Sequence, residues 1–100
     1  MGLIKKDGYI VKGVKLQPAY AKIIWLEATT NPNGENSLNT TFGISTVRQN
    51  LDNGEILSSQ NFSCTYDRSQ DNLFEQAYKK AKETIFLDWE DDIIDPESIN

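Results

Sequence analysis

Hydrophobic and polar positions alternate with the period of a β-strand in the middle of the chain. Residues 38–47 place Phe42 and Ile44 on one face, as expected of a strand with one buried side. Residues 56–66 repeat the alternation around Phe62, with polar residues diluting it. The pattern predicts two neighbouring strands of an antiparallel sheet.

Residues 19–30 have a different pattern, because apolar side chains occur at both odd and even positions. Ile23 and Trp25 share one parity, and Ile24 and Leu26 share the other. A strand that is apolar on both sides is typical of a central strand covered on both faces. We therefore expect this segment to be the middle of the sheet.

Glycine-containing turns connect the predicted strands. Residues 9–11 and 14–16 flank Lys12-Gly13, which indicates a small N-terminal hairpin. The Asn53-Gly54 pair predicts a type I′ turn, since both of its central positions require positive φ. The chain from 19 to 66 is thus predicted to be an antiparallel meander that follows a hairpin.

A helix is predicted over residues 70–86. Asn72 followed by Glu75 resembles a capping box, with Ser69 and Asp71 as other possible caps. The side chains expected to pack on the sheet recur at helical spacing: Phe74, Ala77, Tyr78 and Ala81.

Together these elements predict an α+β fold: an antiparallel meander with an N-terminal hairpin, followed by one C-terminal amphipathic helix and an acidic tail. Residues 1–87 are expected to form the domain, and residues 88–100 the tail. One helix is too narrow to cover a wide sheet, so something else must cover the rest. We expect a second copy rather than the tail, because pressing six acids against apolar surface is costly.

The charge is unevenly distributed along the 100 residues, whose net charge is −5. Residues 1–50 carry six basic and three acidic side chains, whereas residues 51–100 carry four and twelve. Six of those acids lie between Asp88 and Glu97. The single cysteine, Cys64, excludes an intrachain disulfide and favours a reducing compartment. No apolar run or leader pattern predicts a membrane span or a signal peptide.

The composition argues against catalysis, because the chain contains no histidine. Catalytic triads based on histidine and most zinc sites are thereby excluded. Asp88, Glu90, Asp91 and Asp92 have oxygen ligands for a divalent cation, but their spacing is not that of a calcium loop. A solvated tail is the favoured interpretation, and neither an enzyme nor a cofactor is expected.

Five residues are candidates for binding a partner. Trp89 stands among acids, so it either folds back onto the sheet or anchors a docking peptide whose acids meet a basic rim. In the second interpretation Asp91 and Asp92 contribute the charge. Ile23 and Trp25 are the candidates for contact with a second copy.

Four segments resemble small proteins of tailed phages that infect Gram-positive bacteria. These are residues 2–14, from Gly2-Leu3-Ile4 to Val14; residues 62–67, which end in Tyr66-Asp67; residues 72–78; and Trp89-Glu90-Asp91-Asp92. The resemblance implies a structural or assembly protein that acts through protein–protein contacts, as a homo-oligomer or on a larger virion protein. It also implies a location in the virion or the host cytoplasm.

Two alternatives of other classes remain open. In the first, the chain binds single-stranded nucleic acid: Tyr20, Trp25 or Phe42 stacks on bases, and the basic first half follows the phosphates. The basic side chains would then have to share one face: Lys5, Lys6, Lys12, Lys15, Lys22 and Arg48. In the second, the acidic second half mimics nucleic acid and inhibits a host enzyme.

Overall fold

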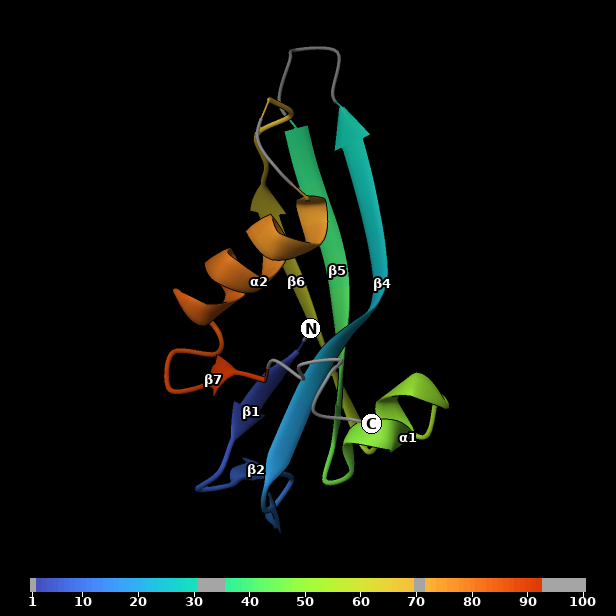
Figure 1. The fold of residues 1–100 in the computed structure, drawn as a ribbon, viewed down its shortest axis with the longest axis vertical. Helices are drawn as coiled ribbons and strands as arrows, with labels where there is room; N and C mark the ends of the chain where they lie inside the picture. Colours follow the sequence, from blue (N-terminus) through green and yellow to red (C-terminus); the bar gives the residue numbers. More distant parts are fainter. Residues whose placement is uncertain (1, 31–35, 70–71, 93–100) are drawn as a thin grey trace, which may run out of the picture.

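The computed structural model describes residues 2–30, 36–69 and 72–92. It shows an antiparallel sheet with a helix across one face (Figure 1). The α+β prediction is confirmed. The elements are β1 (Leu3–Lys5), β2 (Tyr9–Val11), β3 (Val14–Leu16), β4 (Ala19–Thr30), β5 (Asn36–Ser45), α1 (Arg48–Asp52), β6 (Ser58–Thr65), α2 (Leu73–Lys82) and β7 (Glu90–Asp91).

Strands β4, β5 and β6 form the predicted meander. The five-stranded sheet has the order β6-β5-β4-β1-β7, and β5 pairs along the whole length of β4. Strands β2 and β3 pair separately as the predicted hairpin, with positive φ at both Lys12 and Gly13. The N-terminal turn chemistry was therefore read correctly.

A β-bulge explains the apolar residues at both parities of β4. Ile23 lies opposite Phe42 and Trp25 lies opposite Thr41, which leaves Ile24 as the extra residue. The extra residue switches which parity faces the core. Before the bulge the core side includes Ile23, and beyond it the core side includes Leu26, opposite the buried Thr40. Within this chain β4 is covered on both faces for only part of its length, as expected, because Trp25 is 51% exposed.

Two short strands extend the sheet beyond the prediction. Strand β1 pairs with β4 from Ala19 to Ala21 only, and β7 pairs with the other side of β1. Asp92 N–H also donates to the Gly2 carbonyl at 2.8 Å. Backbone pairing therefore ties residues 90–92, which the sequence placed in the tail, to the N-terminus.

The predicted tight turn at Asn53-Gly54 is wrong, because α1 occupies the connection between β5 and β6. Asn53 has φ −92° and its N–H bonds back to the Gln49 carbonyl, so it closes the short helix. Gly54, with φ +78°, then takes the left-handed conformation that commonly follows a helix. The Asn-Gly signal thus marks a helix end here.

Helix α2 begins as predicted and ends earlier. The Asn72 side chain accepts the Phe74 N–H at 2.8 Å, which confirms the cap; residues 70 and 71 lie outside the described part. The helix ends at Lys82 instead of residue 86. Ala77, Tyr78 and Ala81 are buried as expected, but Phe74 is 47% exposed. The prediction for Phe74 is wrong because the helix crosses the strands obliquely and its first turn lies at the margin of the core (Figure 1).

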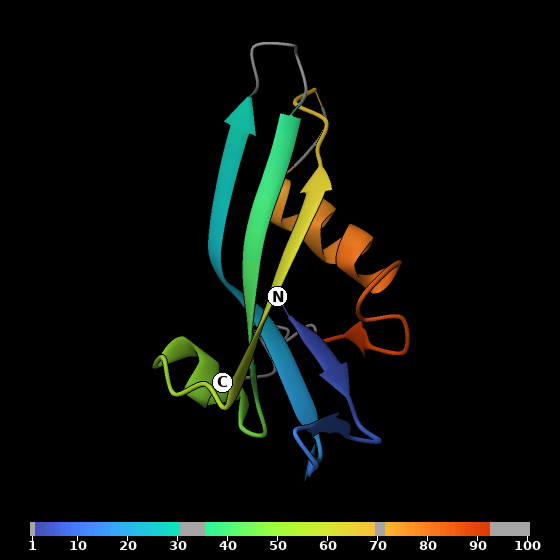
Figure 2. The same cartoon turned by 180° about the vertical axis from the view of Figure 1, so that it is seen from behind.

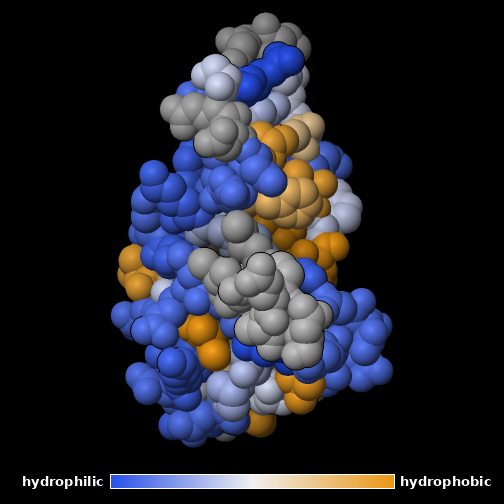
Figure 3. All heavy atoms as spheres, viewed as in Figure 1, coloured by the Kyte–Doolittle hydropathy of each residue, from blue (hydrophilic) through white to orange (hydrophobic). Residues whose placement is uncertain are grey.

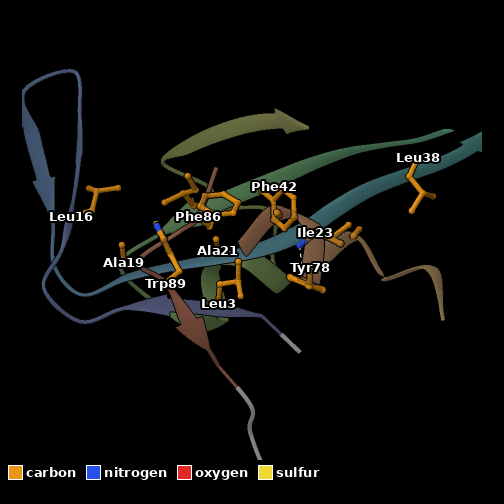
Figure 4. Packing of buried hydrophobic residues seen from close by; sticks show 13 residues of the cluster. Leu3, Leu16, Ala19, Ala21, Ile23, Leu38, Phe42, Tyr78, Phe86 and Trp89 are labelled. Atoms are coloured by element: carbon orange, nitrogen blue, oxygen red, sulfur yellow. Dashed lines mark hydrogen bonds between the residues drawn. The ribbon is translucent and has the colours of Figure 1, made fainter. Parts of the chain in front are cut away.

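Aromatic rings from the C-terminal segment complete the core beneath the helix (Figure 4). The Phe86 ring lies 5.0 Å from the Phe42 ring and 5.0 Å from the Trp89 ring, in edge-to-face geometry. Trp89 is 5% exposed and also contacts Tyr9 of the hairpin. The expectation that the tail stays off the sheet is therefore wrong for Trp89, because its indole covers the core while the neighbouring carboxylates remain outside. Residues Ile93 and Ile94 lie outside the described part.

We predict that Phe86 and Phe74 differ sharply in their contribution to stability. Phe86→Ala should lower the free energy of unfolding by about 3–5 kcal/mol, because it removes a ring that is 1% exposed. Phe74→Ala should cost about 1 kcal/mol or less, since much of that ring is already in water. Urea denaturation of both variants measures the difference, and equal losses would contradict this description of the core.

Candidate interaction surfaces

Strand β4 has a free edge along its distal half, defined here as Ile24–Thr30. The neighbouring strand β1 ends opposite Ala21, while β5 continues beside β4 to Thr30 (Figure 2). Within the described part of the chain, no backbone group pairs with this side of the distal half. Such an edge is a template for another strand.

Tyr78 caps the point where β1 ends. Its hydroxyl oxygen accepts the Ile23 N–H at 2.8 Å, in a buried position. Burial raises the pKa of Tyr78 to about 12, because the phenolate would lose hydration. The hydroxyl thus accepts from the Ile23 N–H, which has no partner strand because β1 ends opposite Ala21. The free edge begins at the next residue.

An apolar strip lies beside the free edge on the helix side of the sheet. We define it by Leu26, Ala28 and Phe74. Leu26 and Ala28 lie opposite Thr40 and Leu38, which are buried, so they face the helix side. Ala28 and Phe74 are nevertheless exposed and Leu26 is half-buried, so α2 leaves this part of β4 uncovered. Figure 3 shows apolar surface between the polar side of α2 and the distal half of β4.

The opposite face of the sheet carries polar amides and hydroxyls around one indole. Trp25 lies opposite Thr41, which in turn lies opposite Asn61. The next row contains Asn39 and Ser63. These five residues, with Glu27 at the corner, are called the amide face below; Trp25 and its neighbours line a shallow hollow of about 270 Å³.

The structure separates the five residues that the sequence suggested as a partner-binding set. Ile23 and Trp89 are 7% and 5% exposed, so neither is available as a surface anchor. Trp25 is exposed on the amide face. Asp91 lies in β7, at one end of the sheet order, and Asp92 follows it; each pairs with a cation. Of the two interpretations of Trp89, the indole folded back onto the sheet is the one found, so it is not the anchor of a docking peptide.

Ion pairs engage part of the charge that the alternative functions need. Arg48 donates two hydrogen bonds to the Asp92 carboxylate, at 2.7 and 2.8 Å, which raises the pKa of the guanidinium. The same guanidinium lies 4.8 Å from the Tyr20 ring centre. Lys22 pairs with Asp52. These basic groups therefore have intramolecular partners.

The described residues contain no group of acidic, cysteine or histidine side chains arranged to hold a metal ion. Burial raises the pKa of the half-buried Cys64 thiol, which favours its unreactive protonated form.

Comparison with known proteins gave no match to a family model, a curated protein or a solved structure. Across the described residues, no helix has the length and apolar character needed to cross a membrane.

Sequence reasoning missed the strip and most of the amide face. Asn39 and Asn61 each occupy a non-core parity of a predicted strand, so the alternation indicates that they face away from the core but not that they lie near Trp25. Leu26 and Ala28 carried no such signal, because a single sequence does not reveal a bulge that reverses parity.

We predict that Tyr78→Phe lowers stability and flattens its dependence on alkaline pH. Removing the hydroxyl leaves the Ile23 N–H unsatisfied and should cost about 1–3 kcal/mol at neutral pH. Burial raises the pKa of this hydroxyl on folding from 10.0 to about 12, so its titration leaves stability unchanged below pH 10. The cost of burying the phenolate then lowers the stability of the wild type as pH rises toward 12, and the phenylalanine variant lacks this loss. Urea denaturation from pH 8 to 12 compares the two proteins, and parallel pH curves would contradict the assignment.

Proposed function

We propose that this chain is a non-enzymatic assembly protein that acts through protein–protein contacts, with a second copy of itself as the partner. The observation that carries the proposal is the free distal edge of β4 with the apolar strip beside it. A strand from a partner pairs with the edge, and its side chains cover Leu26 and Phe74.

Exposure to water is unfavourable for both the unpaired edge of β4 and the apolar strip. Unpaired backbone groups on an edge strand attract further strands, and native proteins usually protect them with lysine, proline or a covering loop. The distal half contains neither lysine nor proline. Backbone pairing alone buries little apolar surface. The adjacent strip supplies apolar surface whose burial favours association.

A second copy is a suitable partner because antiparallel strands pair symmetrically about a twofold axis. Residue i of one copy then meets residue j of the other, and the same two residues meet again across the axis. The resulting sheet is continuous through both copies. The resemblance to small phage proteins supports placing such an assembly in a virion, where a larger protein could also use the edge.

We predict that lysine on this surface shifts the protein toward monomer. Wild-type protein should sediment as a dimer or larger species at micromolar concentration. Ala28→Lys puts a charge on the free edge and Phe74→Lys puts one on the strip; each should raise the dissociation constant about tenfold or more. Both sites are exposed, so the variants should still fold.

Leu87→Lys is the matched control, because Leu87 is 70% exposed and lies in the connection between α2 and β7, a strand that does not pair with β4. It should sediment like the wild type. At a protein concentration of about 100 μM even a weak dimer is populated. A wild-type protein that remains monomeric at this concentration would contradict self-assembly.

Neither alternative function gains support from a specific contact. Phe42 is fully buried and Tyr20 lies against Arg48, so neither ring is placed to stack on a base in the way the nucleic-acid hypothesis requires. Trp25 is exposed, but the one basic residue in the sequences of β4, β5 and β6, Lys22, is paired with Asp52. Asp91 and Asp92 pair with Lys82 and Arg48, which weakens the mimicry of nucleic acid. We therefore do not propose either function.

A further inference from the structure

The amide face combines an exposed aromatic ring with neutral hydrogen-bonding groups. The Trp25 indole, 51% exposed, lies in the first of three adjacent strands, with Thr41 and Asn61 beside it in the same row. The hollow of about 270 Å³ next to the indole is slightly smaller than the roughly 300 Å³ at which drug-sized pockets begin. It has room for one small ring.

The amide groups are oriented by hydrogen bonds within the sheet. Ser63 Oγ donates to Asn39 Oδ1 at 2.8 Å, and Thr41 Oγ1 donates to Asn61 Oδ1 at 3.0 Å. Each carbonyl oxygen is thereby occupied, while neither amide nitrogen has a partner in the described part of the chain. The face thus presents N–H donors beside the indole, with the exposed Glu27 carboxylate as an acceptor.

The charges around the indole fit a neutral ligand. Lys22 is the single basic residue in the sequences of β4, β5 and β6, and it pairs with Asp52. A phosphate placed near Trp25 would meet the Glu27 carboxylate with no free cation to balance it. A ligand rich in hydroxyl groups meets no such repulsion and can both accept from the amides and donate to the carboxylate.

We propose that the amide face binds a neutral saccharide. The C–H face of one pyranose ring lies on the Trp25 indole, whose electron-rich surface attracts the weakly positive C–H groups. Ring hydroxyl oxygens accept from the Asn39 and Asn61 amides, and a hydroxyl donates to Glu27. The side chains of this site and the apolar strip lie on opposite faces of β4, although Trp25 and Glu27 belong to the strand whose free edge pairs with the second copy.

Nuclear magnetic resonance of the nitrogen-labelled protein tests the site directly. The probe is cellotetraose, a neutral extended chain whose ring faces can lie flat on a sheet. The indole N–H of Trp25 and the side-chain amides of Asn39 and Asn61 should shift with a dissociation constant of about 1 mM, and salt should leave it unchanged. The indole N–H resonance of the buried Trp89 should not shift, so it serves as an internal control.

Variants separate stacking from general surface effects. Trp25→Ala should weaken binding about tenfold or more, whereas Trp25→Tyr should keep part of it because a ring remains. Asn39→Ala should also weaken binding. Asn53→Ala, an exposed amide at the end of α1, should not change it. An unchanged Trp89 signal shows that each variant is folded.

Four results would overturn the proposal. They are the absence of any Trp25 shift with cellotetraose, full binding by Trp25→Ala, tighter binding of oligodeoxythymidine that weakens with salt, and Trp25 shifts that follow protein concentration alone. The last would assign the amide face to contact between copies.

Discussion

Strand β4 is twelve residues long, whereas β1, its neighbour on one side, is three residues long. This mismatch divides the molecule into two regions. Where β1 is present, the sheet is five strands wide and β7 closes its edge. Where β1 is absent, β4 becomes an edge itself. The bulge at Ile24 lies just beyond this junction and turns Trp25 toward the opposite face.

The closed region contains most of the aromatic core. Rings of Phe42, Phe86 and Trp89 contact one another in sequence, and Tyr78 extends the cluster to the junction through its contact with Phe42. The Arg48–Asp92 pair joins α1 to the segment after β7, with the Asp92 side chain only 11% exposed. A bidentate pair in such a partly buried site is better held than an exposed one. Stability is thus concentrated away from the free edge, which leaves that edge available for association.

The sequence predicts the elements of this fold well where a local residue pattern is compatible with only one backbone structure. The hairpin at Lys12-Gly13 and the cap at Asn72 depend on backbone conformation and a short side-chain bond, both of which are local. Asn53-Gly54 was misread because glycine with positive φ ends helices as well as closing hairpins. Trp89 was misread because the acids around it suggested solvent, although one indole can turn inward while its neighbours stay out.

The candidate surfaces were less predictable for a related reason. The sequence singled out Trp25 as an apolar residue that one helix cannot cover, and its indole is exposed, but its neighbours depend on strand register. Register places Asn39 and Asn61 around the indole, and the bulge decides that Leu26 belongs to the other face. Both are set by long-range pairing, which a single sequence does not specify.

Hydrogen exchange along β4 tests the central claim that its distal half is a strand-pairing edge. Amides of Ile24–Thr30 that point toward β5 should exchange slowly at every protein concentration, because β5 already binds them. Amides that point away from β5 should exchange quickly in dilute solution and become protected as concentration rises. Outward amides that exchange equally fast at low and high concentration, in a protein that does associate, would contradict the account and place the contact elsewhere.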